Sequence, residues 1–80
     1  MDTRLATVAR ILQLCGERNM APYQLGTKSG VPQSTIKNIL NGTSKNPGIV
    51  TIKKLCDGFE IPLSEFFNTE TFRDLEQEIK

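Results

Sequence analysis

The chain has 80 residues, of which 38% are hydrophobic and 24% charged, and its formal net charge is +1. This length suits one domain with a small core, and no apolar run approaches the roughly 18 residues that span a membrane. The sequence contains no histidine and only two cysteines, so it lacks the residues of a zinc site and of the usual catalytic triads. We therefore expect no enzyme activity, no metal, no cofactor and no small-molecule ligand.

Charge is distributed unevenly along the chain. Residues 1–54 contain eight Lys or Arg and two Asp or Glu, a net charge of +6, whereas residues 55–80 contain two basic and seven acidic residues, a net charge of −5. A basic part joined to an acidic part suggests that the basic part contacts a polyanion. Solvated surface charge produces a similar pattern, so the asymmetry alone does not decide between the two.

Apolar residues recur at helical spacing, and strand patterns are almost absent. The first expected helix covers residues 3–18, and its apolar face consists of Leu5, Val8, Ile11, Leu12, Leu14 and Cys15. Asn19 is suited to end this helix, because Asn tolerates the left-handed conformation. Pro22 fits the first turn of a second helix, which should stop at Ser29 and Gly30.

A third and a fourth helix are expected next. The third begins at Pro32 and ends at Asn41, with Gly42 as a left-handed terminator. Residues 43–48 form a polar loop, and the fourth helix covers residues 49–59. The apolar face of the fourth helix consists of Ile49, Ile52, Leu55, Cys56 and Phe59.

The end of the chain contains two more helical patterns. Pro62 begins a short fifth helix that includes Leu63, Phe66 and Phe67. The tail, residues 68–80, again shows helical spacing, and its apolar positions are Phe72, Leu75 and Ile79. Such a stripe must pack on the domain or on a partner chain. We therefore predict an all-α fold: a compact five-helix domain over residues 1–67 and an acidic, amphipathic helical extension over residues 68–80.

Residues 22–42, PYQLGTKSGVPQSTIKNILNG, contain most of the functional information. They form two short helices joined by a turn that has Gly30 at its first position. The small Gly26 allows the second helix to cross close to the first, while Ile36 and Ile39 anchor the second helix to the core. This pattern predicts a helix-turn-helix at about residues 22–41, with its second helix presented outward.

The exposed face of that second helix is rich in amides and hydroxyls. Its members are Gln33, Ser34, Thr35, Lys37, Asn38 and Asn41. Gln and Asn amides suit the edge of adenine in the major groove, Lys reaches guanine or phosphate, and Ser and Thr serve either purpose. The free N–H groups of the first helical turn also favour phosphate. The alternative is an ordinary solvated face.

Residues 22–67 resemble the helix-turn-helix of phage Cro and lambda-type repressors, also called the XRE family. The shared residues are Leu25, Gly30, Val31, Ser34, Thr35, Ile36, Asn41, Gly42, Asn46, Pro47, Thr51 and the segment 61–67. The resemblance implies a lambda repressor-like domain that binds double-stranded DNA as a homodimer on a palindromic operator. We therefore expect a transcriptional regulator that acts as a repressor, and we expect the fifth helix together with the tail to form the dimer interface.

The resemblance also assigns roles position by position. The base-reading positions hold Gln33, Ser34, Lys37 and Asn38. The positions that contact the DNA backbone hold Asn41, Thr43, Ser44 and Lys45, and Thr35 fits either role. The family often has a phosphate-contacting Gln where this chain has Pro22, so Tyr23 or Gln24 is expected to supply that contact.

Further departures from the family concern the core and one turn. Cys15 and Leu40 stand where the family often has an Arg–Glu ion pair, and we expect them to touch, because packed apolar residues can replace a buried pair without loss of stability. Glu60 stands where the family prefers Gly, which predicts a mildly strained left-handed residue. Both Cys15 and Cys56 are expected as reduced core thiols of a cytoplasmic protein.

Two functions remain open from the sequence. The first is a DNA-binding regulator. The alternative is a protein-interaction module, or an antitoxin-like partner protein, that uses the same fold and binds through its acidic tail. No contact with a membrane is indicated. The remaining helix charges are expected to face solvent, and they are Arg10, Arg18, Lys53 and Lys54.

Overall fold

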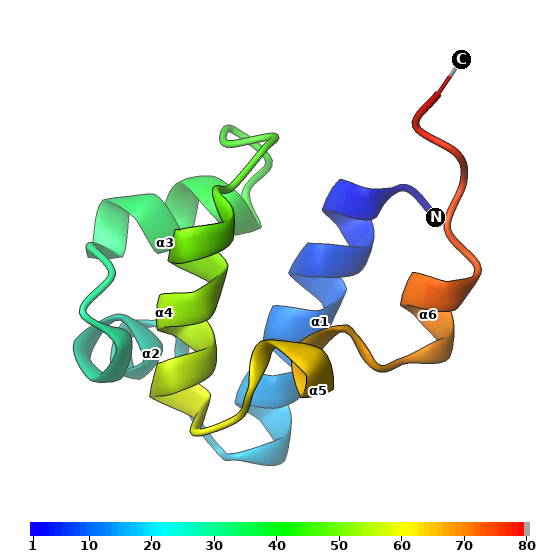
Figure 1. Ribbon diagram of the computed structural model, residues 1–80. Coiled ribbons are helices and arrows are strands. Elements are labelled where there is room, and N and C mark those ends of the chain that lie inside the picture. The colour runs from blue at the N-terminus through cyan, green and yellow to red at the C-terminus, as the bar shows by residue number, and fades with distance from the viewer. Residues whose placement is uncertain (80) are drawn as a thin grey trace.

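The computed structural model describes residues 1–79, which form helices and no strand (Figure 1). The helices are α1 (Thr3–Glu17), α2 (Pro22–Ser29), α3 (Gln33–Leu40), α4 (Ile49–Phe59), α5 (Leu63–Phe67) and α6 (Glu70–Arg73). The predicted all-α fold is confirmed, and the five expected helices are followed by the short α6. No helix within residues 1–79 is long and apolar enough to cross a membrane.

The helices end where local residues favour an end. Asp2 caps α1, because its Oδ1 accepts a hydrogen bond from the Leu5 amide at 2.8 Å. Asn19, with φ of 49°, follows α1 in the left-handed conformation, and Gly30 (φ 74°) does the same after α2. Gly42 has φ of 85°, as expected one residue beyond the end of α3. Glu60 ends α4 at φ 62° and ψ 42°, so the predicted left-handed non-glycine residue is confirmed.

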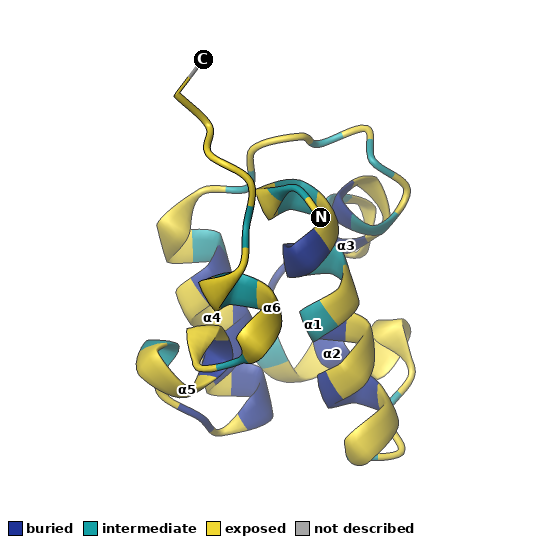
Figure 2. Cartoon of the chain, turned by 90° about the vertical axis from the view of Figure 1, so that its right-hand side faces the viewer, coloured by how far each residue is buried: buried dark blue, intermediate teal, exposed yellow. Residues whose placement is uncertain are grey.

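One hydrophobic core joins α1 to α5, and Figure 2 shows the buried positions on the inner sides of these helices. The largest helix–helix contact joins α2 and α4. Phe72 of α6 packs against the edge of the core. The buried core residues are Ile11, Leu14, Cys15, Leu25, Val31, Ile36, Ile39, Ile52, Leu55, Cys56, Phe59, Ile61 and Phe66.

Some positions expected to be buried are exposed. Leu5 and Leu12 lie on the edge of α1, because its buried stripe runs through Leu14 instead, and Leu12 is 49% exposed. Ile49 opens α4 next to the polar loop and is 60% exposed, and Phe67 is 37% exposed at the end of α5. Helical spacing identified the apolar side of each helix. It did not show how much of that side the neighbouring helices bury.

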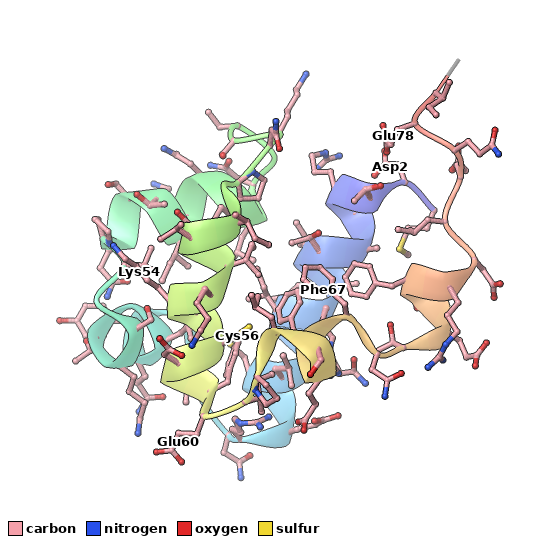
Figure 3. The ribbon with its side chains drawn as sticks, viewed as in Figure 1. Asp2, Lys54, Cys56, Glu60, Phe67 and Glu78 are labelled. Carbon is pink, nitrogen blue, oxygen red and sulfur yellow. The ribbon has the colours of Figure 1, made fainter. Side chains whose placement is uncertain are left out.

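The two cysteines are free and buried. Figure 3 shows Cys56 on the side of α4 that faces α1. Burial raises the pKa of the Cys56 thiol, and it also raises the pKa of the Cys15 thiol, although the nearby Arg18 charge partly opposes this. Leu40 packs half-buried against the core cluster that contains Cys15, and direct contact between these two side chains stays a prediction.

Arg10 of α1 and Arg18, the residue that follows α1, bind the ends of other helices. Arg10 donates through Nε to the Phe66 carbonyl and through Nη2 to the Glu65 carbonyl, each at 2.8 Å. Arg18 donates through Nε to the Phe59 carbonyl at 3.2 Å, with its guanidinium 5.5 Å from the centre of the Phe59 ring. The expectation that these two side chains simply face solvent was therefore wrong, because they donate to carbonyl groups at the ends of α4 and α5.

The two lysines of the same set behave as expected. Both Lys53 and Lys54 are exposed on α4. The ammonium group of Lys53 pairs with the carboxylate of Asp57 one turn further along the helix. Such exposed pairs add little stability, so these lysines contribute charge rather than packing.

The tail is less helical than predicted, because α6 covers only Glu70–Arg73. Phe72 packs against Phe67, with ring centroids 5.0 Å apart, and against Phe66 at 6.0 Å. Ile79, in contrast, is 88% exposed. A short helix needs packing to be stable, and the apolar positions after Phe72 do not provide enough of it. Lys80, the last residue of the expected extension, lies outside the described residues.

Residues 74–79 run back along the beginning of α1 instead. The amino group of Met1 lies 3.3 Å from a carboxylate oxygen of Glu76. The hydroxyl of Thr3 donates to Glu78 Oε2 at 2.8 Å. Residues 74–79 of the acidic tail therefore lie beside the N-terminus of the chain.

Candidate nucleic-acid interface

The pair α2 and α3 is held by a short, fixed turn. Gly30 ends α2 in the left-handed conformation, and its amide donates to the Gly26 carbonyl at 3.0 Å. Val31 is buried, and its amide donates to the Ser29 hydroxyl at 3.2 Å. Pro32 then precedes the first residue of α3. The predicted helix-turn-helix geometry is thus built from local contacts around a single buried valine.

A side chain of α3 fastens its first turn to α2. The Nε2 atom of Gln33 donates to the Tyr23 carbonyl at 2.8 Å. The amide of Gln33 passes directly over Gly26, where a Cβ atom would clash with it. Gly26 was expected to let α3 cross close to α2. In the structure, the space beside Gly26 is filled by the side chain of Gln33. Gln33 retains one amide N–H and its carbonyl oxygen for a ligand.

The outer face of α3 gathers the predicted base-reading residues. Gln33, Lys37 and Asn41 follow one another at intervals of four residues and line one shallow hollow of about 350 Å³ with Pro22. Ser34 and Asn38 form the adjacent row by the same spacing. All five side chains are exposed. In Figure 1, α3 lies at the outer edge of the molecule, away from α5.

The loop after α3 brings the predicted backbone-contacting residues together. The amide of Thr43 donates to Asn41 Oδ1 at 2.8 Å, and the amide of Ser44 donates to the Asn38 carbonyl at 2.9 Å. These bonds wind the loop back over the end of α3. Two hydrogen bonds therefore fix the shape of the loop. Along it follow the side-chain amide of Asn41, the hydroxyls of Thr43 and Ser44, and the exposed Lys45.

The other predicted backbone contacts lie apart from this set. Thr35 is half-buried in the first turn of α3. Tyr23 is 70% exposed on α2, beside Gln33. Gln24 lines a different hollow together with Lys28 and Glu60. Its Oε1 accepts a hydrogen bond from the Ala21 amide at 2.8 Å, which is the glutamine half of a capping box at the beginning of α2.

Arg4, which was not predicted as a site residue, lies close to the end of α3. A Cβ atom on Gly42 would lie 3.1 Å from Nη1 of Arg4. Arg4 and Lys45 also line one groove of about 820 Å³ between the beginning of α1 and the α3–α4 loop. Arg4 stands seven residues before the buried Ile11, and this spacing places it on the inward face of α1. That position was readable from the sequence, but its neighbour in the loop was not.

Comparison with known proteins decides the family. The model of the Cro/C1-type helix-turn-helix DNA-binding domain matches residues 10–71. The chain belongs to this family. The matched residues include all of α2, α3, α4 and α5, so the resemblance found in the sequence is confirmed.

Two relatives illustrate the family. The HTH-type transcriptional regulator SlrR of Bacillus subtilis (strain 168) is 34% identical over 65 residues, which cover 80% of this chain and 43% of SlrR. The chain thus spans less than half the length of that relative. The crystal structure of the prophage Lp1 protein 11 is similar with a TM-score of 0.81 and 28% identity, over 94% of this chain and 100% of the other. The Cro/C1-type fold therefore extends over nearly all of the chain.

Proposed function

We propose that this Cro/C1-type domain is a sequence-specific regulator of transcription that places α3 in the major groove of DNA. The observation that supports this most is the outer face of α3, where Gln33, Ser34, Lys37 and Asn38 are exposed together. Their amide, hydroxyl and ammonium groups match the donors and acceptors of base edges. Asn41, Thr43, Ser44 and Lys45 would then hold the phosphate backbone at the end of the same helix.

We further propose that two copies bind a palindromic operator and repress transcription by occupying it. One recognition helix covers only a few base pairs, so useful specificity requires two half-sites about one helical turn apart. The expected interface is α5 with the tail, and the partly exposed Phe67 gives α5 an apolar surface for this contact. Two chains per operator duplex in sedimentation would support this arrangement, and one chain per duplex would contradict it.

The alternative of a protein-interaction module or antitoxin-like partner draws less support. It relied on Phe72, Leu75 and Ile79 as an apolar binding surface. Phe72 packs between Phe66 and Phe67 of its own chain, and this leaves a smaller apolar surface for a partner. DNA binding is therefore the function that the geometry supports best.

The test is selection of bound duplexes from a random pool, followed by titration of the selected duplex at several salt concentrations. If the domain neutralises six to ten phosphates, affinity should fall about 10³- to 10⁵-fold between about 50 and 200 mM salt. Lys37→Ala and Asn38→Ala should each weaken binding to the selected site by about 1–3 kcal/mol. Lys28→Ala is the matched control. Lys28 is also an exposed lysine, but it belongs to α2 and lines the hollow beside Glu60, not the outer face of α3. Affinity that does not respond to salt would reject the proposal.

A further inference from the structure

Opposite charges meet in the groove between the beginning of α1 and the α3–α4 loop. The groove has a volume of about 820 Å³, and its basic residues are Arg4 and Lys45. Asp2, Glu76 and Glu78 line the same groove. Figure 1 shows that the α3–α4 loop, the N-terminus and the end of the acidic tail lie at one end of the molecule. The groove therefore borders the loop that we assign to the DNA backbone.

Arg4 differs from the other arginines of the chain in that none of its guanidinium donors has a partner among residues 1–79. Arg10 and Arg18 donate to backbone carbonyls, and Arg73 pairs with Glu70. Within residues 1–79, no hydrogen bond or ion pair engages the guanidinium of Arg4. A guanidinium offers five N–H donors in a planar arrangement that suits phosphate. Its guanidinium lies beside Gly42, the residue between Asn41 and Thr43, since a Cβ atom on Gly42 would be 3.1 Å from Nη1 of Arg4.

The acidic tail reaches the groove through weak, exposed contacts. The side chains of the Met1–Glu76 pair are 47% and 66% exposed, and such pairs contribute little to stability. Glu78 is held by the Thr3 hydroxyl, and Figure 3 shows it beside Asp2 at the beginning of α1. In the part of the chain that the structure describes, neither Glu76 nor Glu78 forms an ion pair with Arg4. Their charges therefore act on the groove without occupying the guanidinium.

We propose that Arg4 contacts a DNA phosphate beside the α3–α4 loop, and that Glu76 and Glu78 weaken this contact by repelling the same phosphate. This inference rests on the proposed binding of DNA. Arg4, Glu76 and Glu78 line the same groove, and the repulsion between carboxylate and phosphate should be strongest at low salt, because salt screens charges over about 8 Å at physiological ionic strength. The tail thereby lowers the affinity of the domain for any DNA sequence, since the contact involves no base.

A double-mutant cycle on the full chain tests both parts. The variants are Arg4→Gln, the pair Glu76→Gln with Glu78→Gln, and all three changes together. The probe is a fluorescein-labelled duplex of random sequence, titrated by anisotropy over a series of KCl concentrations. Arg4→Gln should weaken binding about fivefold at low salt and reduce the slope of log affinity against log salt by about 0.9, the value for one phosphate contact. The tail variant should strengthen binding about threefold, and this gain should be largely lost when Arg4 is replaced.

Matched controls separate local effects from net charge. Arg73→Gln removes the same charge from α6, and Glu65→Gln with Glu70→Gln removes two acids that do not line the groove. These controls should leave the salt slope unchanged. Arg4→Gln should also melt at the same temperature as the unaltered chain, because Arg4 has no bonded partner to lose among the described residues.

The outcomes distinguish this inference from the proposed function. If Arg4→Gln leaves affinity and slope unchanged while the unaltered chain binds DNA, Arg4 is not a phosphate contact. If the tail variant gains the same affinity with and without Arg4, the carboxylates do not act on that contact. If the unaltered chain shows no salt-dependent binding, the proposed function fails and this inference fails with it.

Discussion

The basic side chains at the two ends of the molecule are used in different ways. Arg10 and Arg18 donate to the carbonyl groups that end α5 and α4, so their hydrogen bonds belong to the fold. Arg4, Lys37 and Lys45 lie on or beside α3 and its loop, where no hydrogen bond or ion pair among residues 1–79 engages their side chains. A count of positive charges therefore does not measure the capacity to bind DNA. What matters is how many donors the fold leaves unused.

The largest expected effect is on stability, from Arg10→Ala. This change leaves the Phe66 carbonyl without its donor and removes one of the two donors to the Glu65 carbonyl, which keeps the Asn68 amide. Hydrogen bonds to charged groups contribute roughly 1.5–3 kcal/mol, so we expect a loss of about 2–3 kcal/mol in the free energy of unfolding, measured by urea denaturation. Arg73→Ala is the control, because its pair with Glu70 is exposed, and it should cost less than about 1 kcal/mol. Equal losses for the two variants would remove the contrast between structural and surface arginines.

The second effect concerns the contact between α2 and α3, where Gly26→Ala should displace the amide of Gln33 from the Tyr23 carbonyl. The lost hydrogen bond, about 0.5–1.5 kcal/mol, is offset by the better helix propensity of Ala, about 1 kcal/mol. Thermal stability should therefore change little. Affinity for the selected operator should fall by about 1–2 kcal/mol, a loss within the range for a base-reading contact.

Gln33→Ala provides the check on this mechanism. If Gly26 acts only by making room for Gln33, the double variant should bind the operator no more weakly than Gln33→Ala alone. Additive losses would instead show that Gly26 has a separate role, such as setting the distance between the two helices.

A smaller effect is expected from Lys45→Ala. The side chain is exposed and has no bonded partner among residues 1–79, so stability should stay within about 0.5 kcal/mol. Affinity for DNA should fall by about 1 kcal/mol, with a salt slope lower by about 0.9. The loss should be the same on operator and random duplexes, because a phosphate contact reads no base. A loss confined to the operator would place Lys45 among the base-reading residues.

The smallest effect is expected from Glu60→Gly, next to the Phe59 carbonyl that Arg18 binds. Glu60 is left-handed at φ 62°, and this conformation costs a non-glycine residue roughly 1–2 kcal/mol. Glycine relieves the strain but gains unfolded-state entropy of about 0.4–1 kcal/mol. A net gain of about 0.5 kcal/mol in stability should follow, measured by thermal unfolding, with DNA affinity unchanged. A destabilised variant would mean that the Glu60 side chain contributes packing that its exposure does not suggest.

The sequence predicted features that depend on nearby residues. The ends of α1, α2 and α3 followed from single residues that favour left-handed backbone, which are Asn19, Gly30 and Gly42. The helix-turn-helix followed from the same local chemistry, together with the spacing of Ile36 and Ile39. The exposed amides of α3 could be identified from helical spacing alone, because an anchored helix has only one face left for solvent.

Features that depend on distant residues were not predicted. Arg10 binds carbonyls 55 and 56 residues away, and Arg18 binds one 41 residues away. The guanidinium of Arg4 lies near Gly42 in the same way. The course of the acidic tail depends on the position of the N-terminal amino group. Spacing along the chain shows which side of a helix is apolar, but it does not show which element lies opposite.

The reactivity of the two buried thiols can report how often the domain opens. Cys15 and Cys56 are enclosed by the core, and burial raises the pKa of both thiols and so keeps them in the protonated, unreactive form. A thiol reagent can reach them only when the helices separate, so the rate of labelling reports the population of opened molecules. A ligand that binds only the closed form must slow that labelling in proportion to its concentration and affinity. Neither cysteine needs to be near the DNA for this, because the coupling passes through the folding equilibrium of the whole domain.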